Sequence, residues 1–82
     1  MIDKIIIDIL LERDKSILKH GVQQWTPLEW LSILMEEVGE VSKEICEDYF
    51  TSHYPIDPER KNRLRKEIRQ VAAVCIKMLE TI

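Results

Sequence analysis

The sequence is poor in residues that interrupt helices, with only two glycines and three prolines among 82 residues. Aromatic residues make up 6% of the chain, so both turn residues and strand-forming aromatics are too scarce for a many-stranded β fold. Hydrophobic residues account for 45% and charged residues for 33%, a composition that excludes a disordered polymer. We therefore expect an all-α protein that forms one domain over residues 1–82.

A strong excess of one charge and a long hydrophobic run are also lacking. The net charge of −3 argues against nucleic acid and membrane surfaces as partners. Acids interrupt the apolar run at the start, which is too short to cross a bilayer and has no small-residue cleavage site after it. We therefore expect a cytoplasmic protein. Cys46 and Cys75 form no C-x-x-C pair, and their apolar helical positions predict two buried, reduced thiols.

Hydrophobic periodicity predicts three helices, of which the first runs from about Asp3 to Lys19. It stops at Gly21, which we expect in a left-handed helical conformation. Its apolar residues form two stripes about 100° apart. One stripe contains Ile2, Ile6, Ile9, Leu10 and Ile17, and the other contains Ile7, Leu11 and Leu18. One can pack within the chain, and the other predicts contact with a second copy, so that an oligomer completes a four-helix-type bundle.

The sequence TPLE marks the start of the second helix. Thr26 is the predicted N-cap, Pro27 the first helical residue, and Glu29 the acid that closes a capping box onto Thr26. We expect this helix to end near Phe50. One of its sides is apolar and predicted to be buried; it contains Leu31, Leu34, Met35, Val38, Val41, Ile45 and Tyr49.

Five carboxylates share an arc of about 100° on the second helix. They are Glu36, Glu37, Glu40, Glu44 and Glu47. Like charges three or four residues apart destabilise a helix by a few tenths of a kcal/mol per pair. Gly39, in the interior of the same helix, costs it roughly 1 kcal/mol relative to alanine. These features predict a balancing cation or a close-packed neighbour.

The third helix carries a carboxylate within its apolar arc. Asp57 and Pro58 repeat the cap-then-proline signal, and the helix is predicted from about Glu59 to the C-terminus. Glu67 falls on the apolar side, and Gln70 lies one turn later at the margin of that side. A carboxylate that is pushed toward a core requires a partner, a proton or a metal ion.

Glu37, Glu40 and Glu67 are therefore predicted to meet between two packed helices. Hard oxygen ligands of this kind suit Mg²⁺ or Mn²⁺ rather than Zn²⁺. The alternative is a solvated acidic face, with Glu67 paired to Arg63 or Lys66.

The segment RKNRLRK, residues 60–66, precedes Glu67 and carries five basic residues in seven. Arg60 and Arg63 lie on the same side as Glu67, where they could receive phosphate oxygens while a metal ion bridges others. The alternative is a solvated basic turn. Trp25 and Trp30 are interpreted as packing residues or as platforms for a base.

Two short motifs resemble a known family. EEVGE (residues 36–40), followed by EIRQ (residues 67–70), resembles the E-x-x-E…E-x-x-D signature of the MazG-like all-α nucleoside triphosphate pyrophosphohydrolases. The lead-in HGVQQWTPLEWLSILMEEVGE is also similar to that family. The similarity covers nearly the whole chain.

The resemblance implies hydrolysis of a nucleoside triphosphate, NTP or dNTP, to the monophosphate and pyrophosphate. It also implies a Mg²⁺ cofactor and a helical bundle that is a homodimer or homotetramer. Glu37 and Glu40 match the first metal-binding pair, and Glu67 matches the first residue of the second pair. Glu36 matches an additional acid that assists the attacking water. Trp25 falls where relatives contact the nucleotide.

The final acid of the signature is replaced by Gln70. A carboxamide oxygen can still approach Mg²⁺ or a metal-bound water, but the site loses one negative charge. Two functions therefore stay open: an active pyrophosphohydrolase with Gln70 as an auxiliary ligand, or a weak or inactive nucleotide-binding or helical oligomerisation module.

Overall fold

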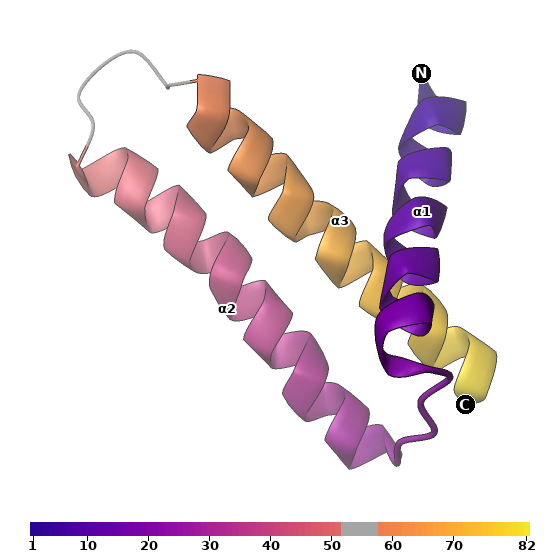
Figure 1. Ribbon diagram of the computed structural model, residues 1–82. Helices are drawn as coiled ribbons and strands as arrows, with labels where there is room; N and C mark the ends of the chain where they lie inside the picture. Colours follow the sequence, from indigo (N-terminus) through magenta and orange to yellow (C-terminus); the bar gives the residue numbers. More distant parts are fainter. Residues whose placement is uncertain (52–57) are drawn as a thin grey trace.

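The computed structural model describes residues 1–51 and 58–82, and within these ranges the chain is helical without strands. It contains α1 (Ile2–His20), α2 (Pro27–Thr51) and α3 (Pro58–Thr81). The all-α prediction and the three helices are confirmed; Asp57, the predicted cap of α3, lies outside the described residues. In Figure 1, α2 and α3 run antiparallel side by side, and α1 crosses the C-terminal half of α3. The helix α3 is thus the central element, which packs against both others.

The end of α1 is set by Gly21. Its N–H donates to the Ile17 carbonyl at 2.7 Å, which closes the last turn. Its φ of 73° is positive as expected, but its ψ of −179° is not that of a left-handed helix. This extended, positive-φ region is accessible almost exclusively to glycine. Gly21 therefore stops α1 and directs the chain away into the connection to α2.

The start of α2 is a complete capping box, as predicted. The Thr26 N–H donates to Glu29 Oε1 at 3.0 Å, and the Glu29 N–H donates to Thr26 Oγ1 at 3.3 Å. The Thr26 hydroxyl also donates to Glu29 Oε1 at 2.8 Å. These bonds lower the pKa of Glu29 because they favour its ionised form. The N-terminus of α2 is therefore fixed by its own local sequence.

A tryptophan anchors α2 to the C-terminal part of α3. Trp30 is fully buried, and the other buried hydrophobic residues among those described are Ala73 and Val74 of α3. The indole Nε1–H donates to Thr81 Oγ1 at 3.1 Å, and the ammonium of Lys77 lies 5.8 Å from the ring centroid. Trp30 is therefore a packing residue in this chain, which confirms one of its two interpretations.

The predicted apolar side of α2 is not the side that packs on α3. Only Leu34 and Val41 of that set are half-buried, whereas Leu31, Met35, Val38, Ile45 and Tyr49 are exposed. The α2 residues that are shielded are centred roughly 90° around the helix from that side: Trp30, Ile33, Leu34, Glu37, Val41 and Glu44. The expected burial of this apolar side is therefore not provided by α3 in the single chain, and two glutamates take part of its place.

The helix α1 contributes no buried residue to the fold. It is attached to α3 by polar contacts: the Arg13 guanidinium binds both carboxylate oxygens of Glu80 at 2.6 and 2.5 Å, and Lys77 donates to Ser16 Oγ at 2.7 Å. Both predicted apolar stripes of α1 stay largely exposed in the single chain. No described helix is long and apolar enough to cross a membrane.

The two cysteines differ from the prediction. Both are free thiols, but Cys46 is exposed and Cys75 is half-buried, so neither is a core residue. Cys46 is exposed because α2 turns its glutamate side, and not its apolar side, toward α3.

Candidate functional site

Two carboxylates from different helices converge on one amide group. With the Gln70 amide nitrogen turned toward the acids, it donates to Glu67 Oε2 at 2.9 Å and to Glu37 Oε2 at 3.3 Å. Glu67 and Gln70 lie one turn apart on α3, and Glu37 faces them from α2. The predicted meeting of Glu37 with Glu67 is therefore present, and Gln70 lies between them. We call these three residues the acidic cluster.

The charges of the acidic cluster are only partly compensated. Partial burial is the largest cause that raises the pKa of Glu37, followed by the negative charges of Glu67, Glu36 and Glu40. Lys77 acts in the opposite direction, because its positive charge favours the ionised carboxylate.

The pKa of Glu67 is raised in the same way. Partial burial is again the largest cause, and the charges of Glu40, Glu44 and Glu12 add to it. Lys66 is the neighbouring cation that opposes this rise. Both acids thus bind a proton more readily than a solvated glutamate does.

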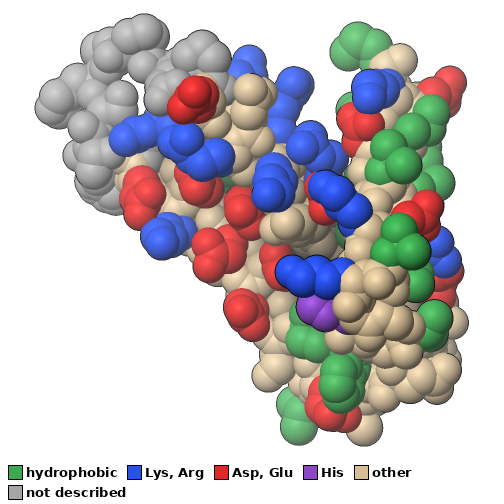
Figure 2. Space-filling view, viewed as in Figure 1, with side chains coloured by type: hydrophobic (Ala, Val, Ile, Leu, Met, Phe, Trp, Pro, Cys, Tyr) green, Lys and Arg blue, Asp and Glu red, His purple; other side chains and the backbone are tan. Residues whose placement is uncertain are grey.

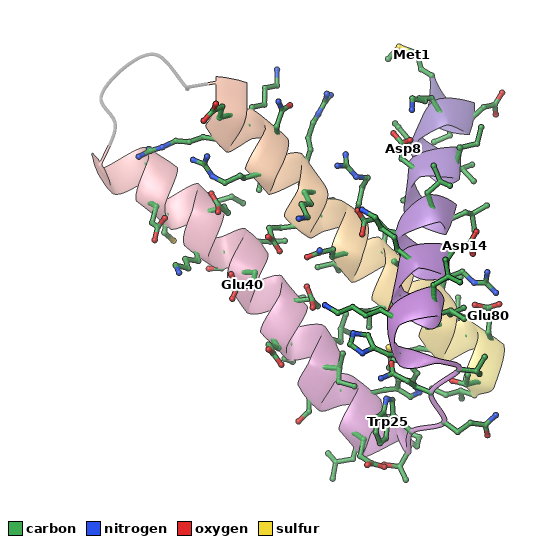
Figure 3. All side chains as sticks on the ribbon, viewed as in Figure 1. Met1, Asp8, Asp14, Trp25, Glu40 and Glu80 are labelled. Atoms are coloured by element: carbon green, nitrogen blue, oxygen red, sulfur yellow. The ribbon has the colours of Figure 1, made fainter. Side chains whose placement is uncertain are left out.

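Nearby glutamates of α2 have different environments. Glu44 is half-buried and lies 3.7 Å from Arg63 Nε, so one α2 acid is balanced by α3. Glu40, labelled midway along α2 in Figure 3, is exposed, yet its charge reaches both Glu37 and Glu67. Glu36 is exposed beside Glu37. The arc of carboxylates is therefore divided between solvent and the α2–α3 contact.

The acidic cluster fits a hard divalent cation as an incomplete ligand set. Among the described residues, no group of three or more Asp, Glu, His or Cys side chains is arranged to hold a metal ion. Glu37 and Glu67 nevertheless bring two carboxylate oxygens close to one point, with a carboxamide beside them. Mg²⁺ is commonly bound by one or two carboxylates, while waters and substrate phosphates supply its other ligands. Two convergent carboxylates and a carboxamide match that pattern.

A cleft of about 720 Å³ opens beside the acidic cluster, between α1 and the α2–α3 pair. Glu37 and Gln70 line it, so the cluster forms part of its wall. The cleft has the size of a typical small-molecule site. Figure 2 shows Lys and Arg side chains gathered along the α1 and α3 sides of this region, while Asp and Glu side chains follow α2. The cleft therefore places Glu37 of the acidic cluster close to lysines of α1 and α3.

The predicted substrate-binding residues do not line this cleft. Arg63 faces Glu44, and Arg60 is half-exposed near the start of α3. Trp25 lies just before α2, near the lower end of the molecule in Figure 3, with 38% of its surface exposed. Their roles as phosphate and nucleotide ligands stay predictions.

The sequence did not indicate the lysines of the cleft. Lys15 and Lys19 of α1 and Lys77 of α3 line it, together with Lys66. In the sequence, each of them looks like an ordinary solvated cation on an amphipathic helix. The i,i+4 spacing of Lys15 and Lys19 was a detectable signal of a shared face. That this face meets α3 depends on the crossing of α1 over α3.

No family model, curated protein or solved structure matches the chain. The resemblance to the MazG-like enzymes therefore depends on the motif residues, of which Glu37, Glu67 and Gln70 lie together and Glu40 lies nearby.

Proposed function

We propose that the chain is a divalent-metal-dependent nucleoside triphosphate pyrophosphohydrolase, which converts an NTP or dNTP to the monophosphate and pyrophosphate. The observation that supports this function best is the convergence of Glu37 and Glu67 on Gln70, at the wall of a cleft with basic residues opposite. A phosphoanhydride substrate needs both features: hard oxygen ligands for a metal ion, and cations for its phosphate oxygens.

Glu37 and Glu67 would hold Mg²⁺ or Mn²⁺, with Glu40 as the nearby third acid. The metal ion supplies charge neutralisation and polarisation of the phosphate chain. The side chains have separate roles: Glu37 and Glu67 would hold the metal ion between α2 and α3, and Glu36 lies beside Glu37 to accept a proton from water. The exposure of Glu36 leaves it accessible to such a water.

Gln70 can serve this site in two orientations. With its amide nitrogen turned toward the acids, Gln70 donates to both of them and separates their charges. A half-turn of the amide places the carbonyl oxygen in the same position, where it becomes a neutral ligand for a cation. Gln70 thereby stabilises the cluster without metal and still offers an oxygen when metal is present. An aspartate at this position offers only the second role.

The reaction requires that water adds across the α–β phosphoanhydride bond. A new P–O bond to the water oxygen forms, the bridging P–O bond breaks, and pyrophosphate leaves with its bridging oxygen. The proton from water passes to a carboxylate, for which Glu36 is the assigned acceptor, and then to solvent. Lysines of the cleft stabilise the charge that develops on the leaving pyrophosphate.

The test is release of pyrophosphate from a panel of NTPs and dNTPs with Mg²⁺ or Mn²⁺. Wild-type protein is expected to release pyrophosphate and monophosphate, and not orthophosphate and diphosphate. Glu67→Gln keeps the shape of the side chain but removes a ligand charge, so its rate is expected to fall by about 100-fold or more, in line with loss of a major electrostatic group. No pyrophosphate from any nucleotide with either metal would refute the function.

A second candidate function, a helical oligomerisation module, is favoured by the exposed side of α2. Leu28, Leu31, Met35, Val38 and Ile45 are 38–75% exposed and follow the alternating three-and-four spacing of a heptad seam, with one position occupied by Ser42. We call these five residues the α2 seam. A chain of this size buries a modest fraction of its surface and is only marginally stable alone. A second copy is the occupant that covers the α2 seam in both candidate functions.

Gly39 supports close approach of that second copy. A Cβ built at Gly39 meets nothing within 4 Å, so packing inside the chain does not require glycine there. Gly39 follows Val38 of the α2 seam, where a facing helix would gain from the absence of a side chain. Assembly through the α2 seam without turnover of any nucleotide would favour the module over the enzyme.

A further inference from the structure

The cleft beside the acidic cluster has a positive charge of its own. Four lysines line it, Lys15 and Lys19 from α1 and Lys66 and Lys77 from α3, against the two acids Glu12 and Glu37. The difference, four minus two, is a charge of +2 in a chain whose net charge is −3. Two lysines of α1 and two of α3 therefore share one cleft.

These lysines are not paired with carboxylates. By contrast, Lys4 forms an ion pair with Asp8, and Arg13 forms ion pairs with Glu80 and Asp14. Within the described residues, the four lysines of the cleft make no such ion pair. Like charges that face one cleft repel each other, and a bound anion removes that repulsion.

Lys77 is the partly buried lysine of the cleft. It is half-buried, and its ammonium donates to Ser16 Oγ at 2.7 Å and lies over the Trp30 ring. Burial is the main cause that lowers the pKa of Lys77, and the charge of Glu37 opposes it. An ammonium held this way is pre-positioned, because Ser16 and Trp30 fix it between α1 and α2.

We propose that this cleft is a polyphosphate-binding site in which Lys15 and Lys19 of α1, with Lys66 and Lys77 of α3, bind the phosphate oxygens of a linear polyphosphate chain. The ligand is the triphosphate of a nucleotide or a free inorganic polyphosphate, since both present the same anionic oxygens. This site would bind the phosphates of the proposed substrate. The proposal rests on the proposed function only if the ligand is a nucleotide. It transfers the phosphate contacts from Arg60 and Arg63 to lysines that line the cleft with Glu37 and Gln70.

The cleft residues of α1 and of α3 each follow one face of their helix. Lys15 and Lys19 lie four residues apart on one face of α1, and the α3 residues that line the cleft follow one face at positions 66, 70, 73, 74 and 77. Glu37 and Gln70 lie across from α1. A bound polyphosphate therefore lies between the ammonium groups of α1 and those of α3, with the acidic cluster, where a metal ion is needed, beside it.

The experiment measures binding of sodium tripolyphosphate by calorimetry in EDTA at low salt, so that metal-dependent binding and hydrolysis are removed. The test variant is Lys15→Gln/Lys19→Gln. The matched control is Lys43→Gln/Lys61→Gln, which makes the same charge change at two exposed lysines outside the cleft. We expect wild type and control to bind within about twofold of each other and the cleft variant to bind about tenfold or more weakly, which is the loss expected for charge-assisted contacts. Equal weakening in both variants, or no binding by wild type, would overturn the proposal.

A second arm identifies the source of the phosphates. If an NTP or dNTP binds at least about tenfold tighter than tripolyphosphate and the cleft variant reduces both, the site holds a nucleotide. If nucleotides bind no tighter and none releases pyrophosphate with Mg²⁺ or Mn²⁺, the site holds free polyphosphate; the lysine assignment then stands while the pyrophosphohydrolase fails. Pyrophosphate release by an unimpaired Lys15→Gln/Lys19→Gln variant would give the reverse result: the enzyme stands and the lysine assignment is overturned.

Discussion

Glu37 of α2 and Glu67 of α3 direct one carboxylate oxygen each to the same atom, the Gln70 amide nitrogen, at 3.3 and 2.9 Å. Two acids with raised pKa values therefore share one neutral donor. The donor lowers their repulsion but does not neutralise it. This relationship explains how α2 tolerates a glutamate against α3, and it makes position 70 the most informative site for substitution.

Gln70→Asp is expected to be less stable than wild type without metal and to bind a metal ion more tightly. The variant loses the amide that donates to Glu37 and Glu67 and adds a third negative charge. Loss of hydrogen bonds to charged groups destabilises by roughly 1.5–3 kcal/mol in buried settings, so we expect a loss of about 1 kcal/mol at this partly exposed site. Denaturation in EDTA and in excess Mn²⁺ measures both effects. A variant that is no less stable than wild type in EDTA would contradict the bridging role of Gln70.

Trp30→Ala is expected to separate α2 from α3. The side chain is fully buried, and replacement of a buried tryptophan by alanine costs about 3–5 kcal/mol. Trp30→Phe keeps most of the buried surface but removes the bond to Thr81 Oγ1, so it is expected to cost about 1 kcal/mol for that bond. Urea unfolding followed by circular dichroism ranks the two variants. Equal costs would show that packing does not dominate the role of Trp30.

The link between Arg13 and Glu80 predicts a pH-dependent contribution to stability. Hydrogen bonds from Arg13 lower the pKa of Glu80 below its usual value of 4.5. The folded state therefore gains stability from this acid above pH 4.5, and the gain disappears as pH falls through the lowered pKa. Glu80→Gln is expected to unfold at a lower temperature than wild type at pH 7, and at nearly the same temperature near pH 3. A melting difference that is constant from pH 7 to pH 3 would exclude this pair as its source.

Self-association is expected to involve the α2 seam. At micromolar concentration, light scattering should give wild-type protein the mass of a dimer or tetramer. Met35→Lys places a charge within the α2 seam and is expected to shift the mass toward that of one chain, because a buried unpaired ammonium is unfavourable. Leu11→Lys makes the same change on the exposed stripe of α1. Dissociation by Leu11→Lys alone would assign the interface to α1, and a monomeric wild type would refute self-association.

Local chemistry in the sequence accounts for the helices and their ends. The capping box of Thr26 and Glu29 involves residues three positions apart, so the sequence contains all of its partners. Gly21 is predictable as a stop for the same reason, although its ψ depends on the direction that the chain takes toward α2. The meeting of Glu37 with Glu67 was also predictable, because Glu37 borders the apolar side of its helix and Glu67 lies within the apolar arc of the third helix.

The features that the sequence did not predict depend on how the helices pack against one another. An apolar stripe on α2 indicates that something covers it, but not whether the cover is α3 or another copy of the chain. Met35 and Ile45 are consequently exposed while Glu37 packs toward α3, where Gln70 and Lys77 compensate it. The cleft lysines come from two helices that are distant in sequence, so their convergence follows only from the crossing of α1 over α3.

The measurement that tests the central claim most directly is thermal unfolding with and without Mg²⁺ or Mn²⁺. A metal ion that binds the folded acidic cluster stabilises it by about 2.7 kcal/mol at a hundredfold excess over Kd. We expect the wild-type melting temperature to rise with millimolar metal, and Glu67→Gln to lose this rise. Glu40→Gln should melt at the same or a higher temperature than wild type in EDTA, because it relieves repulsion, and should respond less to metal. A wild-type melting temperature that does not change with millimolar Mg²⁺ or Mn²⁺ would contradict the metal site and the hydrolysis that depends on it.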